Sequence, residues 1–445
     1  MIACGIVFYA FYTRFVIEAP KKEYPLAQNA KEAQRQDLDY LSLYINLDRS
    51  FDTEEKRAAF NKSIKEVEKQ LPVSKSQFEM AIAKMMAIAD NTHTNVHPGS
   101  RARRFNAIPL RFYWFEESLH VVMTKDAQKD LLGAKIIRIN GHTPMDLLEK
   151  IKPWYGGANT RLKFFSPLYF MSPELLNAIG YGLGKDAIAI EYIDVEGKIA
   201  SRTIKTDEAS KKNSSYWPPN WLNPSKRTLE NGWNALPVNH RVALPFQHLE
   251  KNVWHEFINN GLYVKLNENA NTEHLNINSY LKNITNEFQK KTLEFVILDV
   301  RFNPGGDYNL ARSFIKAMDK KLDENQPFYI VTGNGTFSAG IMTAAIAKHT
   351  LGNKAKIIGE PVGDRLQFWS DGGSVMRLPN SKIPLRIWTA YQDWENGCSD
   401  WSKCFWITIF DGVAVNNLDP DVKSSLRFSD FMKGEDTALN TIFNR

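Results

Sequence analysis

The second half of the chain alternates between short apolar strands and helices, and this alternation limits the possible folds most. Residues 294–300 and 328–332 are rich in β-branched and other apolar side chains, which is typical of buried strands. Each is followed by a segment with helical spacing, at 310–318 and 341–349, and a further strand is expected at 355–358. This alternation predicts a layered α/β fold with largely parallel strands.

The 445 residues divide into five segments. An apolar segment covers 1–20, helices are expected in 28–100, and short strands with one or two helices are expected in 105–205. Residues 206–237 are rich in Lys, Asn, Ser, Pro and Trp, and we interpret them as a linker or surface insertion. The α/β domain covers 238–445.

The apolar N-terminal segment has two interpretations. Residues 2–17 are nearly all apolar apart from Thr13 and Arg14, and charged residues follow at 18–24. The run is short for a spanning helix, which needs about 20 residues, and it lacks the basic stretch that precedes a signal core. We expect an export signal or membrane anchor and a location outside the cytoplasm, in the periplasm or secreted. The alternative is an amphipathic helix packed on the body.

Composition and cysteine usage argue against nucleic-acid-binding, metal-binding and cofactor-binding proteins. The net charge of +6 is mild for this length, and no basic stripe is interleaved with aromatic residues, so we expect no nucleic-acid partner. The spacing of cysteine and histidine fits no zinc site, and the chain has no phosphate-binding glycine loop, so we expect no metal and no cofactor. Cys398 and Cys404 are close enough in sequence to close a small loop in an oxidising compartment.

A glycine turn and a serine turn each lie between an expected strand and an expected helix. The first is DVRFNPGG, Asp299 to Gly306. Consecutive glycines there allow backbone N–H groups to face an anion, as an oxyanion hole requires, although they also suit a tight turn. The second is TFSAG, Thr336 to Gly340. Its serine, Ser338, is a candidate nucleophile, and the alternative is a helix N-cap.

A serine hydroxyl needs a base, and histidine is the usual base near neutral pH. The segment Asp90-Asn91-Thr92-His93-Thr94 ends the N-terminal helical region and supplies one candidate, His93. Each of these three features is weak alone. Their combination and order give the prediction its specificity.

Taken together, the segments resemble the S41 peptidases, the tail-specific or C-terminal-processing proteases. DVRFNPGG is similar to their D-L-R-x-N-x-G-G motif, and TFSAG to their T-x-S-A-x nucleophile segment. NTHT is similar to the D-G-H-T motif of the branch related to the tricorn core protease. Residues 416–422 and 434–439 resemble the closing G-V-x-P-D-I and G-x-D-x-x-L stretches, and 132–141 is similar to part of a PDZ-like domain. The resemblance covers about 35–443.

The resemblance implies a crotonase-like α/β core with an N-terminal helical region, a PDZ-like peptide-binding module and hydrolysis without a metal. It transfers the nucleophile to Ser338. It also implies that backbone N–H groups near Gly305, Gly306 and Ala339 stabilise the oxyanion.

The sequence departs from the family pattern at two positions. The commonest branch uses a lysine base, and Asp364 stands where that lysine is expected, so the base should be His93 as in the tricorn-like branch. The acidic catalytic residue of that branch would align with Ala414, whose side chain cannot act as an acid. Asp364 is the first candidate for the third residue, and Asp393 and Glu395 follow.

The predicted function is therefore that of a serine endopeptidase acting on protein or peptide substrates through a Ser–His acyl-enzyme mechanism. Two alternatives stay open. One is a catalytically inactive protein of the same fold that binds peptides or small apolar ligands. The other is a membrane-anchored scaffold that uses the PDZ-like module alone.

Overall fold

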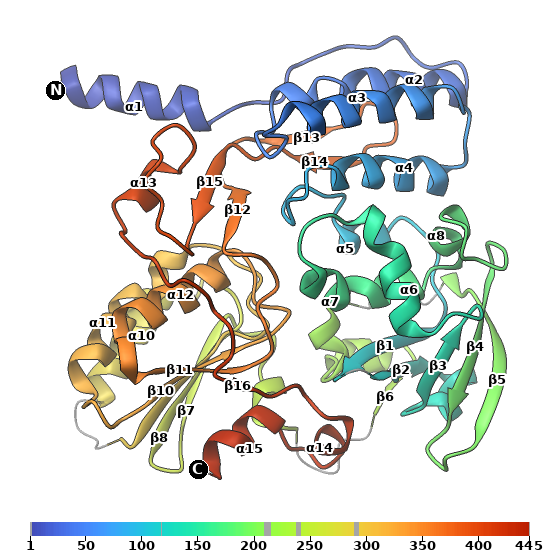
Figure 1. Ribbon diagram of the computed structural model, residues 1–445. Helices are drawn as coiled ribbons and strands as arrows, with labels where there is room; N and C mark the ends of the chain where they lie inside the picture. The colour runs from blue at the N-terminus through green and yellow to red at the C-terminus, as the bar shows by residue number, and fades with distance from the viewer. Residues whose placement is uncertain (1, 117, 209–214, 237–241, 289–292, 445) are drawn as a thin grey trace.

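The computed structural model describes residues 2–116, 118–208, 215–236, 242–288 and 293–444 (Figure 1). Part of the expected linker, 209–214, lies outside the described residues. The fold is mixed α/β with several sheets, as the alternation of strands and helices predicts.

A six-stranded sheet forms the centre of the C-terminal half. Its strands are β7 (Val253–Ile258), β8 (Gly261–Leu266), β9 (Phe295–Asp299), β10 (Phe328–Thr332), β11 (Ala355–Gly359) and β16 (Val422–Lys423), in the order β16-β11-β10-β9-β8-β7. All neighbours are parallel except β7 and β8. The prediction of a largely parallel sheet is confirmed.

Helices cover both faces of this sheet. On one face lie α10 (Ile277–Phe288), α11 (Arg312–Lys321) and α12 (Ala339–Leu351) (Figure 1). On the other, α15 (Thr437–Phe443) places Leu439 and Ile442 against Tyr263 and Tyr329. Strands buried on both faces are apolar throughout, which explains why β9 and β10 show no alternation of polar and apolar residues.

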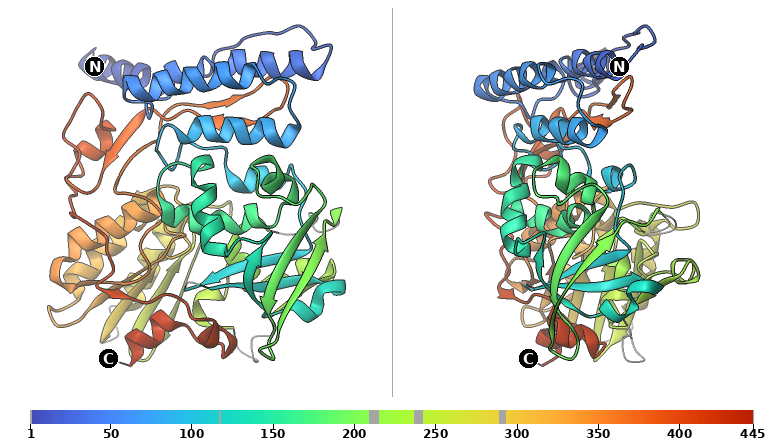
Figure 2. Two further views of the ribbon diagram at one scale, coloured as in Figure 1. Left: turned by 45° about the vertical axis from the view of Figure 1, so that its right-hand side comes forward. Right: turned by 90° about the vertical axis from the view of Figure 1, so that its right-hand side faces the viewer.

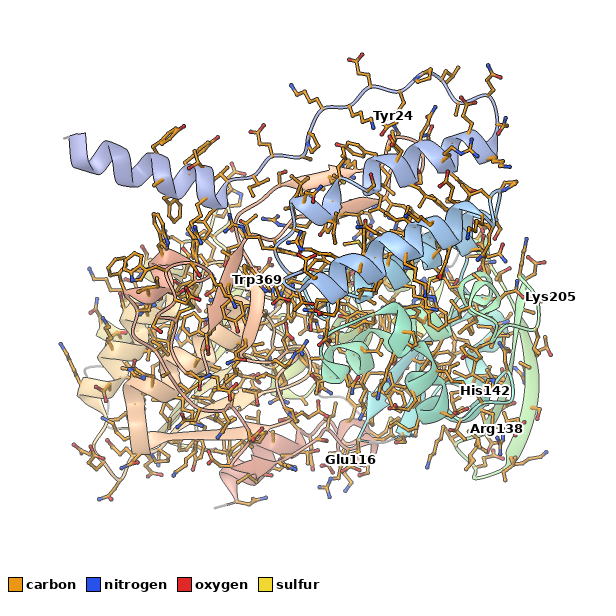
Figure 3. The ribbon with its side chains drawn as sticks, turned by 45° about the horizontal axis from the view of Figure 1, so that its top comes forward. Tyr24, Glu116, Arg138, His142, Lys205 and Trp369 are labelled. Atoms are coloured by element: carbon orange, nitrogen blue, oxygen red, sulfur yellow. A yellow bond between two sulfur atoms is a disulfide. The ribbon has the colours of Figure 1, made fainter. Side chains whose placement is uncertain are left out.

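A second sheet forms a smaller module beside the first (Figure 2). Its strands β1 (Leu110–Phe115), β2 (Ser118–Lys125), β3 (Lys135–Ile139), β4 (Ala187–Ile193) and β5 (Ile199–Lys205) pair antiparallel in chain order. The helices α6 (Pro144–Ile151), α7 (Asn159–Phe170) and α8 (Pro173–Ala178) belong to the same apolar core. Arg138, His142 and Lys205 mark the edge of the module farthest from the parallel sheet (Figure 3).

The segment 206–237 is more than a linker, and that interpretation needs correction. It contains a 3₁₀ turn (Pro218–Trp221), α9 (Lys226–Glu230) and β6 (Trp233–Ala235), and β6 pairs with β2. Trp221 and Trp233 are 1% and 2% exposed in the core of the small module. The polar composition concealed these two large apolar side chains, whose burial fixes the segment to the sheet.

The N-terminal helices share their core with a distant part of the chain. They are α2 (Ala30–Leu41), α3 (Glu54–Glu68), α4 (Lys75–Ala87) and α5 (Pro98–Ala102), with a 3₁₀ turn at Tyr44–Asn46. Ser74 caps α4 in a capping box with Gln77, in line with its predicted position at the helix start. The hairpin of β13 (Val375–Arg377) and β14 (Pro384–Arg386) completes this core, so residues 28–100 do not close it alone.

An extension connects the parallel sheet to the N-terminal helices. It contains β12 (Gln367–Ser370), paired with β15 (Ala390–Asp393), and then α13 (Trp406–Ile409). Figure 3 labels Trp369 on β12 near those helices. A disulfide joins Cys398 to Cys404 before α13. The remaining short helix is α14 (Phe428–Met432).

The N-terminal helix α1 (Ile2–Phe15) ends against this extension (Figure 1). The ring of Phe15 lies edge-on to Phe405 and Trp406, at 5.3 and 5.6 Å between centroids. The Arg14 side chain donates to the carbonyl of Ser402. Of the helices described, none has the length and apolar character needed to cross a membrane.

Candidate active site

Ser338 lies in the loop between β10 and α12, directly before the first residue of the helix. Its backbone has φ 51° and ψ −125°, a region that non-glycine residues rarely adopt. Its side chain is half-buried and forms no capping hydrogen bond with α12. Ser338 is therefore not an ordinary helix N-cap. Strained backbone at such a turn is a feature of functional sites.

The glycine turn of 303–306 lies against Ser338. A Cβ added to Gly305 would lie 2.8 Å from Ser338 Cβ and 3.2 Å from its Oγ, so no larger residue fits there without movement. The turn itself is held by Asn303, which donates to the Leu266 carbonyl at 3.0 Å. Phe337 N–H donates to the Asn303 carbonyl at 2.9 Å. The two turns thus form one rigid unit.

The backbone donors of this unit are not equivalent. Gly305 N–H already donates to Asn303 Oδ1 at 2.9 Å, so the expectation that Gly305 supplies a free donor is corrected. Gly306 forms a parallel bridge with Asn269, in which Asn269 N–H donates to Gly305 O and Asp307 N–H donates to Asn269 O. That pairing leaves the N–H of Gly306 itself unused.

Ala339 supplies the second unused donor. As the first residue of α12, its N–H has no intrahelical acceptor. Within the described parts of the chain, neither it nor Gly306 N–H has a hydrogen-bond partner. A helix N-terminus also favours negative charge. These two N–H groups are available for an anion beside Ser338.

His93 lies beside Asp364, although 271 positions separate them in sequence. The Nδ1 of His93 is 3.5 Å from Asp364 Oδ2, and the two side chains are 4% and 1% exposed. The other oxygen of Asp364 accepts from Thr92 Oγ1 at 2.6 Å and from Arg365 N–H at 2.9 Å. Asp364 is therefore fixed in position by the residue that precedes His93.

The loop that carries His93 is pinned to β12. Asn91 Nδ2 donates to the Trp369 carbonyl at 2.9 Å, and Trp369 N–H donates back to Asn91 Oδ1 at 3.0 Å. Trp388 Nε1 donates to the His93 carbonyl at 2.7 Å. The N-terminal helices and the C-terminal extension thus position His93 together.

Aromatic rings enclose the His93 imidazole. It stacks on Phe337 at 4.3 Å and on Phe368 at 5.0 Å between centroids, and Trp388 lies edge-on at 5.3 Å. Phe337 directly precedes Ser338 in the chain. Neither ring nitrogen of His93 has a hydrogen-bond partner among the described residues. Both nitrogens are buried, and Nδ1 faces Asp364 Oδ2 at 3.5 Å.

Arg161, from α7 of the small module, is a further residue near the site that the sequence did not indicate. Its guanidinium lies 4.3 Å from the centroid of Phe337, on a ring that also stacks on His93. It donates to the Gly335 carbonyl at 3.0 Å. Burial lowers the pKa of Arg161 to about 10. An isolated arginine in a helix gives no sequence signal for this contact.

The other acid candidates lie elsewhere. Asp393, on β15, accepts from Gln367 Nε2 at 3.2 Å and from Asn396 N–H at 2.8 Å. Glu395 borders a surface depression that Asp364 also lines. Neither is in contact with His93. Within the described residues, no cluster of three or more His, Cys, Asp or Glu side chains is placed to hold a metal ion.

The scan against family models gave no match, and neither did the search of curated proteins. Among solved structures, mature CPAF complexed with lactacystin matches with a TM-score of 0.56 at 10% identity, over 93% of this chain and 97% of that chain. A common fold over nearly the whole of both chains follows from this match.

Two more solved structures match with lower scores. The photosystem II D1 C-terminal processing protease has a TM-score of 0.37 at 13% identity, over 88% of this chain and 93% of that chain. A putative S41 protease from Bacteroides fragilis has a TM-score of 0.30 at 12% identity, over 76% of this chain and 82% of that chain. At these TM-scores neither match supports a statement about the fold or the function of this chain. The CPAF match alone carries the statement of fold.

Proposed function

We propose that this chain is a serine peptidase that cleaves protein or peptide substrates through Ser338. The observation that carries the proposal is the convergence of three separate segments on one point. The strained Ser338 turn lies against the glycine turn, and His93, paired with Asp364, stacks on Phe337, the residue directly before Ser338. Each group alone has an ordinary structural explanation, but their assembly matches the requirements of acyl transfer.

In this mechanism Ser338 Oγ attacks the carbonyl carbon of the scissile peptide. His93 Nε2 takes the hydroxyl proton as general base, and the carbonyl oxygen becomes an oxyanion between Gly306 N–H and Ala339 N–H. His93 then donates that proton to the leaving amine. Water, activated by the same nitrogen, hydrolyses the acyl-enzyme and frees the serine.

Asp364 orients the imidazole in this proposal. A carboxylate at Nδ1 holds the tautomer that leaves Nε2 unprotonated, and it stabilises the imidazolium that forms during attack. The hydrogen bonds from Thr92 and Arg365 fix one carboxylate oxygen and leave the other facing His93. The Nε2 atom is buried and has no hydrogen-bond partner among the described residues, which fits a catalytic contact that tightens only in the substrate complex.

The proposal is tested by covalent labelling with a fluorophosphonate probe. We expect the native protein to be labelled, Ser338→Ala to lose labelling completely, and His93→Ala to lose most of it. Ser424→Ala and His274→Ala are matched controls, because Ser424 is a half-buried serine elsewhere and His274 an exposed histidine. Equal labelling of native protein and Ser338→Ala excludes the mechanism. Hydrolysis of casein then separates endopeptidase activity from a reactive serine alone.

We also propose that the protein acts outside the cytoplasm, that residues 1–20 serve as signal or anchor, and that the small module binds peptide as a PDZ-like domain. The disulfide between Cys398 and Cys404 supports an oxidising compartment. Fractionation of cells that express the full chain, with alkylation of free thiols before lysis, tests location and pairing together. Recovery of both cysteines as free thiols from the cytosolic fraction contradicts the location.

A further inference from the structure

A pocket opens next to Ser338. Its lining includes Gly306, Ser338, Met342, Phe405 and Ile407, and its volume is 260 Å³. His93 does not belong to the lining. Because His93 would protonate the leaving amine, a pocket that borders the oxyanion donor but not His93 lies on the acyl side of the scissile bond. The side chain it would hold is that of P1, the residue that supplies the attacked carbonyl.

One wall of the pocket is apolar. Met342 comes from the first turns of α12, whereas Phe405 and Ile407 come from the segment after the disulfide. Phe405 N–H donates to the Tyr391 carbonyl on β15 at 2.9 Å, which fixes this segment to the extension. Apolar side chains at these positions can pack against the methylene groups of a long substrate side chain.

The remaining wall carries two carboxylates, Asp307 and Asp371. Asp307 Oδ1 accepts from Asn309 N–H at 2.9 Å, and Asp371 Oδ2 accepts from Gln392 Nε2 at 2.9 Å. These donors are neutral. In the part of the chain that the structure describes, neither carboxylate forms an ion pair, although the chain carries a net charge of +6. The nearby Arg312 is paired with Asp411 at 3.0 Å instead.

We propose that this pocket binds a lysine or arginine side chain at P1, so that the peptidase cleaves after basic residues. This inference rests on the proposed function and deepens it. The methylene groups of the substrate side chain pack on Met342, Phe405 and Ile407, and its cationic end reaches Asp371 and Asp307. A charge-assisted hydrogen bond to an unpaired carboxylate is among the stronger polar contacts available to a substrate.

Asp371 is the residue best placed to set this specificity. It lies directly after β12, the strand that carries Phe368 against His93, and its backbone has φ 56°. Gln392, a fully buried residue of β15, holds one of its oxygens. The carboxylate is thus fixed by the same two strands that support the proposed base, and a rigid specificity residue discriminates better than a mobile one.

The experiment measures inactivation rates with three peptidyl phosphonates that differ only at P1, carrying Lys, Leu or Glu, beside the untargeted fluorophosphonate. We expect the Lys probe to react fastest and the Glu probe slowest. In Asp371→Asn the rate of inactivation by the Lys probe should fall about 10- to 100-fold. The rates of inactivation by the Leu probe and by the fluorophosphonate should stay the same. Asp371→Lys should make the Glu probe faster than the Lys probe.

Asp323→Asn is the matched control, since it removes the same charge from an exposed loop outside the pocket. If the fluorophosphonate does not label the native protein, the proposed function is overturned, and this inference with it. Normal fluorophosphonate labelling with no preference for the Lys probe, or with a preference unchanged in Asp371→Asn, overturns this inference alone. Fluorophosphonate labelling of each variant also shows that it has folded.

Discussion

At the scale of single residues, the proposed site relies on Asp364, at the position where the commonest branch of the resembled family has a lysine. Asp364 faces His93 Nδ1 at 3.5 Å, and both side chains are almost completely buried. A carboxylate there cannot deprotonate serine itself, but it can orient a histidine that does. An aspartate at position 364 therefore fits a histidine base, and it cannot form a Ser–Lys dyad.

The first prediction concerns Asp364. Asp364→Asn should lower kcat/KM by about 10³- to 10⁴-fold, because the amide no longer selects the tautomer with a free Nε2. The measurement is steady-state hydrolysis of a peptide substrate. Asp393→Asn is the control and should retain activity, since among the described residues that side chain forms hydrogen bonds to Gln367 and Asn396 and none to His93. Equal losses in both variants would contradict the assignment of Asp364.

The second prediction concerns Gly305, which has φ 127° and no space for a side chain. Gly305→Ala should abolish fluorophosphonate labelling, because the new Cβ would lie 2.8 Å from Ser338 Cβ and displace the nucleophile. Gly184→Ala provides the comparison, since Gly184 has φ 137° with no atom within 4 Å of an added Cβ. That variant carries the same kind of backbone strain and should be labelled normally. Full labelling of Gly305→Ala would show that the turn is not rigid.

At the scale of elements, α7 connects the small module to the nucleophile loop through Arg161. Its guanidinium is also 4.8 Å from the Phe165 ring centroid and 5.5 Å from that of Trp217. A buried arginine held by carbonyls and aromatic faces is costly to place unless each contact is made. The position of Phe337, and with it that of His93, therefore depends on how the module docks.

The third prediction follows from this contact. Arg161→Met keeps the length of the side chain but removes the donors, and it should lower kcat at least about 10-fold through disorder of the loop 333–338. Arg202→Met is the control, because its partner Asp130 lies on the exposed surface of the same module. Activity and the free energy of unfolding are measured together. Unchanged kcat in Arg161→Met, with the protein folded, would contradict a positioning role.

At the scale of the whole molecule, a buried charge network joins the parallel sheet to the C-terminal helix. Asp299, at the end of β9, contacts Lys265 Nζ at 2.9 Å and Arg301 Nε at 3.0 Å. Arg301 also bonds Asp436 at 2.6 Å, and Asp436 caps α15. The D-x-R pair of the sequence motif is thus structural, and it anchors the glycine turn that follows.

The fourth prediction concerns the pH dependence of this network. Burial alone would raise the pKa of Asp299, but Arg301 and Lys265 outweigh it and lower the pKa below the ordinary value. A lowered carboxyl pKa stabilises the fold above the unfolded value of about 3.9, and this stabilisation is lost as pH falls through the folded value. Asp299→Asn should therefore be less stable than the native protein by about 3 kcal/mol at pH 7.

The measurement is urea unfolding of both proteins from pH 7 to pH 3. The difference in free energy of unfolding should stay constant down to about pH 4 and shrink below it. Asp323→Asn serves again as control, since its carboxylate is exposed and removal of a solvated charge changes stability little. A difference that persists unchanged to pH 3 would assign the effect to packing and not to charge.

The sequence by itself determined the strands, helices and turns that carry the chemistry. Short apolar runs rich in β-branched residues are typical of strands buried on both faces, and glycine or serine turns after parallel strands lie at the carboxyl edge of the sheet. From this logic β9, β10, β11 and α12 were predictable, as was the proximity of Ser338 to Gly305. Such elements can be predicted from the sequence because their apolar residues recur with the period of a helix or a strand.

Only the tertiary structure decided which distant residues meet. The motif position ranked Asp364 before Asp393 and Glu395, but only the structure places its carboxylate 3.5 Å from His93 Nδ1. The contact of Arg161 with Phe337, the burial of Trp221 and Trp233, and the position of Asp371 in the same pocket as Ser338 likewise depend on how separate elements pack. Such contacts join residues tens to hundreds of positions apart, and packing of complementary surfaces fixes them without leaving any periodic pattern in the sequence.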